Sequence, residues 1–264
     1  MELDFYHVDA FSECAFKGNP AAVFVLQSWL SDELMQAIAN EFNLSETVFS
    51  VWEEEHYRIR WFTPEAEIPL CGHATVATSH VLYQHMGYRE SSIPFMSLSG
   101  PLSTSYEQGV HTLDFPANPA KPVFEPTIKE IVAGPILETL TCARKLIVIV
   151  ESEEQVKSLQ PDFLKIAKLP YRGVCVTARA SSPNIDFVCR FFAPAIGINE
   201  DPVTGNIYTI LGPYYAQLTG KNVFNARQLS KRSGDVGVVV QGDRVLISGK
   251  AHTVMHGKYY LDNL

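Results

Sequence analysis

The residues best suited to chemistry lie in two similar segments about half a chain apart. The first, residues 67–73, reads EIPLCGH, and the second, residues 200–206, reads EDPVTGN. An Arg-aromatic-Phe-x-Pro run precedes each segment. Aligned on Pro69 and Pro202, the copies lie 133 residues apart in a chain of 264. A repeat of this length predicts two similar halves related by a pseudo-twofold, each presenting the same turn to a shared cleft.

Each segment ends in glycine and a short polar residue where a helix is predicted to begin. Amides of a first helical turn have no acceptor within the helix, and the helix dipole adds positive potential there. Two such ends facing one cleft would bind a carboxylate or a similar anion. We therefore predict that the substrate is bound by five residues of the two segments: Cys71, Gly72, Thr204, Gly205 and Asn206. The alternative is that both glycines only satisfy tight turns.

Two further residues of these segments are candidates for catalysis. His73 stands near a helix start, where the dipole disfavours an imidazolium, so we expect a neutral imidazole that can donate or accept a proton. The alternative is a capping or core histidine. Asp201 is equivalent to Ile68 of the first copy. Because that residue is apolar, the duplication alone does not explain an aspartate at position 201. It is either a helix cap or a catalytic carboxylate, and the surrounding motif favours catalysis.

Glu46 lies outside the repeat, at the start of an apolar strand. A carboxylate there would be partly withdrawn from water, which suits general acid–base work, although spacing alone favours a solvated surface residue. Cys71 has Thr204 as its repeat partner. A racemase with two opposed thiols needs cysteine at both places, so this pair argues against that mechanism.

The patterns of apolar, capping and turn residues predict an α+β fold. In the first half, we predict strands at 5–8, 22–26, 47–52, 57–62 and within 95–115, and helices from Ser31 to 42 and at 72–86. In the second half, we predict helices at 128–133, 152–169 and 205–218, and strands at 136–142, 146–150, 173–179, 185–192, 236–240, 245–248 and 258–261. Each half is then a curved, mostly antiparallel sheet or barrel around one central helix that begins at the motif.

Residues 116–126 contain four prolines, which fit neither a helix nor a central strand. This segment is the best candidate for the connection between two domains. We therefore place the domains at 1–117 and 118–254, and residues 255–264 would return to the first.

Composition narrows the class of protein and its partners. The net charge of −8 argues against nucleic acid as a partner. Residues 1–5 carry no secretory signal, and no stretch is apolar enough to span a bilayer. Five cysteines without CxxC pairing are expected as reduced thiols of a cytoplasmic protein. Histidines and cysteines never cluster at ligand spacing along the chain, so we expect no metal.

Four segments resemble signature segments of the PhzF family of phenazine-biosynthesis isomerases, which is similar in fold to diaminopimelate epimerase. They read FKGNPAAV (16–23), NLSET (43–47), FTP with CGHAT (62–64 and 71–75) and EDPVTG (200–205). The resemblance spans nearly the whole chain. It implies two similar domains with the site between them, no cofactor and no metal. It also places the catalytic residues at Glu46, His73 and Asp201.

The chain departs from the family pattern after the second motif. The family commonly has Ser, Ala and His there, and this chain has Asn206, Ile207 and Tyr208. These changes lie where members of the family recognise their substrate. The resemblance therefore does not identify the substrate of this chain. We predict a cofactor-independent isomerase, with a homodimer as a candidate assembly, that moves a proton within a small carboxylate. The alternatives are an epimerase or racemase that uses Cys71, and a small-molecule binding protein that has lost catalysis.

Overall fold

The computed structural model describes residues 1–261, and the chain divides into two compact units. The first holds Met1–Asp114 and the chain from Ser248 on, and the second is Phe115–Ile247. The sequence placed these boundaries at 117 and 254. The second boundary lies earlier because the last strand pairs with the first strand along its whole length, from Ala251 opposite Ala10 to Tyr260 opposite Glu2.

Within residues 1–261, the first unit is mostly strand, with two helices. Its elements are β1 (Glu2–Ala10), β2 (Asn19–Leu26), α1 (Asp32–Phe42), β3 (Glu46–Glu53), β4 (His56–Phe62), β5 (Glu67–Ile68), α2 (Gly72–Gln84), β6 (Ser92–Ser97), β7 (Gly100–Glu107), β8 (Val110–Pro116) and β18 (Ala251–Tyr260). The side chain of Ser31 caps α1 by accepting from the Leu34 amide, as the sequence predicts.

The second unit has the same order of strands. Its elements are β9 (Lys121–Pro122), β10 (Ile136–Cys142), β11 (Lys145–Val150), α3 (Glu153–Ser158), α4 (Phe163–Ala167), β12 (Gly173–Arg179), β13 (Phe187–Ala193), β14 (Ile198–Asp201), α5 (Tyr208–Thr219), β15 (Val223–Gln228), β16 (Gly234–Gln241) and β17 (Arg244–Gly249). Short 3₁₀ helices cover Pro126–Glu130, Pro194–Ile196 and Gly205–Ile207.

Strand pairing repeats from one unit to the other. β2 pairs with β3 in parallel, and so does β11 with β12. A second parallel pair joins β4 to β6 in the first unit and β13 to β15 in the second. The hairpins β3–β4 and β12–β13 are antiparallel in both. The predicted internal duplication is therefore present in the topology as well as in the motif.

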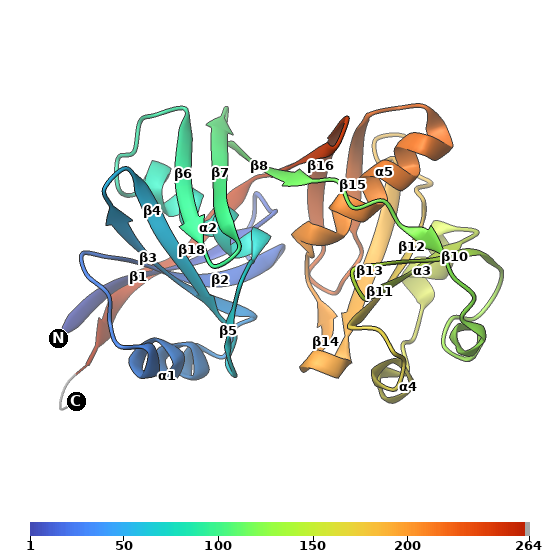
Figure 1. Ribbon diagram of the computed structural model, residues 1–264, viewed down its shortest axis with the longest axis horizontal. Coiled ribbons are helices and arrows are strands. Elements are labelled where there is room, and N and C mark those ends of the chain that lie inside the picture. Colours follow the sequence, from blue (N-terminus) through green and yellow to red (C-terminus); the bar gives the residue numbers. More distant parts are fainter. Residues whose placement is uncertain (262–264) are drawn as a thin grey trace. The chain divides into compact units, whose positions relative to one another are not determined.

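One helix in each unit packs against strands of that unit, α2 in the first and α5 in the second (Figure 1). Residues of α2 are buried on all sides of the helix, from His73 to Tyr83, and α2 packs on β1, β2, β3, β7 and β18. In α5 the buried residues include Tyr208, Leu211 and Tyr215. This confirms a central helix that follows each motif.

The structure differs from the sequence prediction at four helices. The helix predicted over 128–133 is a 3₁₀ helix over Pro126–Glu130. The helix predicted over 152–169 is two short helices, α3 and α4, because Pro161 lies between them and proline cannot continue a helix. The helix predicted from Gly205 starts with one 3₁₀ turn, and α5 begins at Tyr208. The helix predicted to reach residue 86 ends at Gln84, before Gly87 adopts a left-handed φ of 74°.

An arginine clamp holds each copy of the motif to its preceding strand. The guanidinium of Arg60 donates to both carboxylate oxygens of Glu67, at 2.8 and 2.7 Å. Arg190 donates to both oxygens of Glu200, at 2.7 and 2.9 Å. Such two-pronged pairs fix the relative orientation of the two strands. The glutamates of the repeat are therefore structural.

No helix within residues 1–261 is long and apolar enough to cross a membrane. The cytoplasmic location expected from the sequence stays a prediction.

A row of histidines inside the first unit predicts acid sensitivity. Burial lowers the pKa of His111 to about 3 and that of His80 to about 4, from an ordinary value of 6.5. Thr104 donates to Ser79, so Ser79 donates its own hydrogen to His111 Nδ1 at 2.9 Å, which favours the neutral ring. Because the pKa is lower in the folded state, the stabilisation is complete above pH 6.5 and is lost as the pH falls toward 3.

Replacing His111 with glutamine tests this contribution. His111→Gln keeps an acceptor for Ser79 but does not titrate, so its melting temperature should fall less than that of the wild type between pH 7 and pH 5. Thermal unfolding followed by circular dichroism at the two pH values measures the difference. Equal losses in both proteins would assign the acid sensitivity to other groups, of which His80 is the next.

Candidate active site

Glu46 is the first residue of β3 and lies inside the first unit. The parallel pairing of β2 with β3 puts Glu46 beside Ala21, and its side chain is only 9% exposed. The expectation from spacing alone, a solvated surface glutamate, is therefore wrong. A carboxylate can be buried at this depth only if neighbouring groups compensate for the loss of water.

His73, the second residue of α2, is that neighbour. Its Nε2 lies 3.0 Å from Glu46 Oε2, and its side chain is 5% exposed. The ring and the carboxylate are not aligned for a hydrogen bond, so Glu46 Oε2 is buried without a hydrogen bond from any residue in the described part of the chain. A buried carboxylate oxygen of this kind is free to take a proton from a bound molecule.

Asn19 contacts the other nitrogen of the same ring. Its Nδ2 lies 3.1 Å from His73 Nδ1, and the Asn19 side chain is fully buried. Gly18, just before it, has a φ of 67°, and a Cβ there would lie 2.1 Å from the backbone oxygen of Ala10. Only glycine fits that turn, which sets the position of Asn19. The amide and the carboxylate therefore hold the imidazole from its two ends.

Two opposed effects act on the charge state of His73. Burial lowers the pKa of His73, but its contacts with Cys71 and Glu46 outweigh burial and raise this pKa. Asn19 Nδ2 only donates, so its contact with His73 Nδ1 requires a nitrogen without a proton there. The neutral imidazole expected from the helix dipole therefore stays a prediction.

Cys71 completes the buried group. Its Sγ lies 3.5 Å from His73 Nδ1. Burial, followed by the Glu46 carboxylate, raises the pKa of the Cys71 thiol. The sulfur is therefore protonated at neutral pH, and a thiolate is the form that acts as a nucleophile or base.

The same three side chains lie close enough to share a metal ion, since one potential ligand atom from each lies within 4.8 Å of the others. The sequence argument against a metal used spacing along the chain, and that argument fails because Glu46 comes from a different element than Cys71 and His73. The short distance between Glu46 and His73 gives these groups a second explanation, an ion pair. The absence of a metal stays a prediction.

The second motif builds a separate group in the second unit. Asp201 is the last residue of β14 and accepts a hydrogen bond from Thr204 Oγ1 at 2.6 Å. Gln228, at the end of β15, donates to the backbone oxygen of Asp201 at 2.7 Å. Gly205 is buried in the 3₁₀ turn that precedes α5, and Asn206 beside it is exposed.

The structure thus brings Glu46, Cys71 and His73 together in one unit, with Gly72 at the start of α2, and Asp201 with Thr204 in the other. Sequence reasoning missed Asn19 and Gln228. Asn19 lies within the segment 16–23 that carries the family resemblance, which was the available signal. No sequence signal marked Gln228, because its hydrogen-bond partners Thr204 and Asp201 lie 24 and 27 residues away along the chain.

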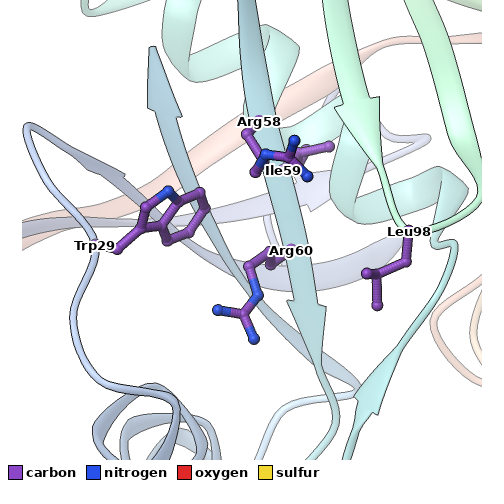
Figure 2. A pocket seen from close by; sticks show the side chains of 5 residues that line it. All are labelled: Trp29, Arg58, Ile59, Arg60 and Leu98. Carbon is purple, nitrogen blue, oxygen red and sulfur yellow. The ribbon is translucent and has the colours of Figure 1, made fainter. Parts of the chain in front are cut away.

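A pocket of about 230 Å³ lies elsewhere on the first unit, on β4 (Figure 2). It is lined by Trp29, Arg58, Ile59, Arg60 and Leu98. Both arginines are paired, Arg58 with Glu53, and Arg60 with Asp32 and Glu67. Their charges are therefore already balanced, and none of the candidate site residues lines this pocket.

Comparison with solved structures defines the class of protein. A probable proline racemase from Agrobacterium radiobacter superposes with a TM-score of 0.63 at 11% identity, covering 98% of this chain and 93% of the racemase. A PhzF family protein from Enterococcus faecalis superposes with a TM-score of 0.96 at 42% identity, covering 99% and 100%. The fold is diaminopimelate epimerase-like, as the sequence predicts.

The family follows from the sequence comparisons. The PhzC-PhzF family model, described as phenazine biosynthesis-like protein, matches residues 8–257. An uncharacterised isomerase of Pseudomonas aeruginosa is 47% identical over 262 residues, which cover 99% of this chain and all of the relative. The chain belongs to the PhzC-PhzF family. The prediction of a PhzF-type enzyme of the isomerase class is confirmed.

Proposed function

We propose that the protein is a cofactor-independent isomerase that moves a proton within a small carboxylate substrate. The observation that carries this proposal is the buried pair of Glu46 and His73, in which a carboxylate oxygen lies 3.0 Å from a ring nitrogen and has no aligned hydrogen bond. Family membership supports the reaction class. The substrate class is drawn from the chemistry of the motifs.

Glu46 is the proton carrier in this mechanism. Its carboxylate takes a proton from a carbon of the substrate, the C–H electron pair moves into the substrate, and Glu46, after its proton has exchanged with solvent, returns a proton to a second carbon. The substrate gains and loses one proton, so no oxidant or reductant is needed. A general acid–base of this kind contributes ~10²–10⁴-fold to the rate.

His73 supports both halves of the step. Before the reaction, its Nε2 lies 3.0 Å from the carboxylate oxygen that receives the proton. When Glu46 carries that proton, the ring N–H stabilises the negative charge that develops on the substrate. Asp201 is proposed to bind a polar group of the substrate from the second motif.

The substrate carboxylate is proposed to bind at the amides of Gly72 and His73, which open the 13-residue helix α2. The matching contact at Gly205 and Asn206, and the shared cleft that it requires, stay predictions from the repeat. A crystal soaked with the substrate tests them directly.

Deuterium exchange tests the proposed function. The protein is incubated in D₂O with a panel of small carboxylates, hydroxy acids and amino acids that carry acidic C–H groups, without added metal or cofactor. Proton NMR and mass spectrometry should show deuterium at a carbon of at least one acid. Tight binding without exchange across the panel would instead support a binding protein that has lost catalysis.

The rival enzymatic mechanism, an epimerase or racemase that uses Cys71, predicts a different mutant result. Because the pKa of the Cys71 thiol is raised and Thr204 offers no second thiol, Cys71→Ser should keep most of the turnover of the acid that exchanges best. Cys14→Ser, at an exposed cysteine, serves as the matched control. A loss of ~100-fold or more in Cys71→Ser alone would support thiol chemistry.

A further inference from the structure

A fully buried glutamine links the parts of the second motif. Gln228 Oε1 accepts from the Thr204 amide at 2.9 Å, and Gln228 Nε2 donates to the backbone oxygen of Asp201 at 2.7 Å. The same Nε2 lies 3.2 Å from Thr204 Oγ1. One amide side chain therefore holds the two ends of the turn from Asp201 to Thr204.

The direction of each hydrogen bond in this group is fixed by chemistry. A backbone N–H only donates and a backbone oxygen only accepts, so the Gln228 amide can have just one orientation. Its Nε2 must then donate to Thr204 Oγ1. The Thr204 hydroxyl has one hydrogen, and Asp201 Oδ2 lies 2.6 Å from Thr204 Oγ1 to accept it. The chain of donors runs from Gln228 through Thr204 to Asp201.

We propose that Gln228 and Thr204 are positioning residues that orient the Asp201 carboxylate and keep Oδ2 an acceptor. This inference rests on the catalytic role of Asp201 in the proposed function. It also reassigns Thr204, which the sequence predicts to contact substrate, because its hydroxyl already donates one hydrogen bond and accepts another. A threonine suits this place better than the cysteine of the first copy, since a thiol is a weak donor.

A pair of variants at Thr204 separates orientation from general stability. Thr204→Val keeps the shape and removes the hydroxyl, whereas Thr204→Ser keeps the hydroxyl. Crystal structures without substrate should show the Asp201 carboxylate turned or disordered in Thr204→Val and unchanged in Thr204→Ser. Melting temperatures report any loss of folding. An Asp201 carboxylate that keeps its wild-type orientation in Thr204→Val overturns the proposal.

Kinetics give a second, independent measurement with the panel acid that exchanges best. Thr204→Val should lose roughly 10- to 100-fold in kcat, with a smaller change in KM, and Thr204→Ser should recover most of it. The acid limb of the pH–rate profile should move to higher pH in Thr204→Val, because a carboxylate that loses a donor is protonated more easily. A Thr204→Val enzyme with wild-type kcat and pH profile would contradict the positioning role.

Gln228→Glu tests the direction of the chain. A carboxylate at position 228 only accepts, so the Thr204 hydroxyl should turn to it and leave Asp201 without this donor. The crystal structure and the pH profile should then match those of Thr204→Val. If no acid of the panel exchanges with the wild type, the proposed function fails, while the Asp201 orientation in these crystals still decides the positioning role.

Discussion

Glu46→Gln is expected to lose ~10²–10⁴-fold in turnover while the protein still folds and binds its substrate. Glutamine has nearly the shape of glutamate but cannot take up a proton at this site. The variant also removes the negative charge that lies 3.0 Å from His73 Nε2. Its amide fits the same buried space, so the fold of β3 should not change.

Deuterium incorporation into the panel acid that exchanges best is the direct measurement. The wild type should place deuterium on a product carbon, and Glu46→Gln should not. Glu53→Gln, at the other end of β3, is the matched control, because Glu53 binds Trp29 and Arg58 in a structural contact. Exchange at the wild-type rate in Glu46→Gln would show that another group is the base.

The fold could be predicted from the sequence because the duplication is visible in it. Two copies of one motif at half-chain spacing, each before a helix with apolar residues on several faces, predict two units with a buried helix. The motif glutamates, Glu67 and Glu200, then follow as equivalent residues, and both prove to be held by arginines. Repetition supplies this information without any knowledge of long-range contacts.

The burial of the candidate site residues could not be predicted in the same way. Glu46 is buried because β2 and β3 pair in parallel and α2 packs against both, and these contacts are distant in sequence. The local pattern around Glu46 instead favoured a surface residue, and only the family resemblance pointed to catalysis. The contact between Glu46 and His73 could not be predicted for the same reason, since the two residues lie 27 positions apart in the chain.

Side-chain amides that orient catalytic groups are the hardest residues to predict. Asn19 reaches His73 from another element, and Gln228 reaches Thr204 and Asp201 from β15. Neither has a charge or a reactive group that marks it in the sequence. These amides act through hydrogen bonds to groups that are distant in the sequence. Only the folded chain brings those groups within hydrogen-bond distance.

The second large effect is expected on stability, from Arg190→Met in the second unit. The Arg190 side chain is 11% exposed and that of its partner Glu200 is 18% exposed. Arg190 also donates to the backbone oxygen of Leu159 at 2.7 Å. Removing the guanidinium leaves a largely buried carboxylate and a carbonyl without this donor, which should cost about 3–5 kcal/mol of unfolding free energy. Unfolding in urea, followed by circular dichroism, measures the loss.

Two further variants show whether the clamp is the cause. The double variant Arg190→Met with Glu200→Met removes the stranded carboxylate, so it should recover part of the loss. Arg60→Met breaks the equivalent clamp of the first unit, where the side chains of Arg60 and Glu67 are 19% and 22% exposed, so the first-unit loss should be slightly smaller. An Arg190→Met loss below about 1 kcal/mol would contradict a buried clamp, since that is the range of an exposed ion pair.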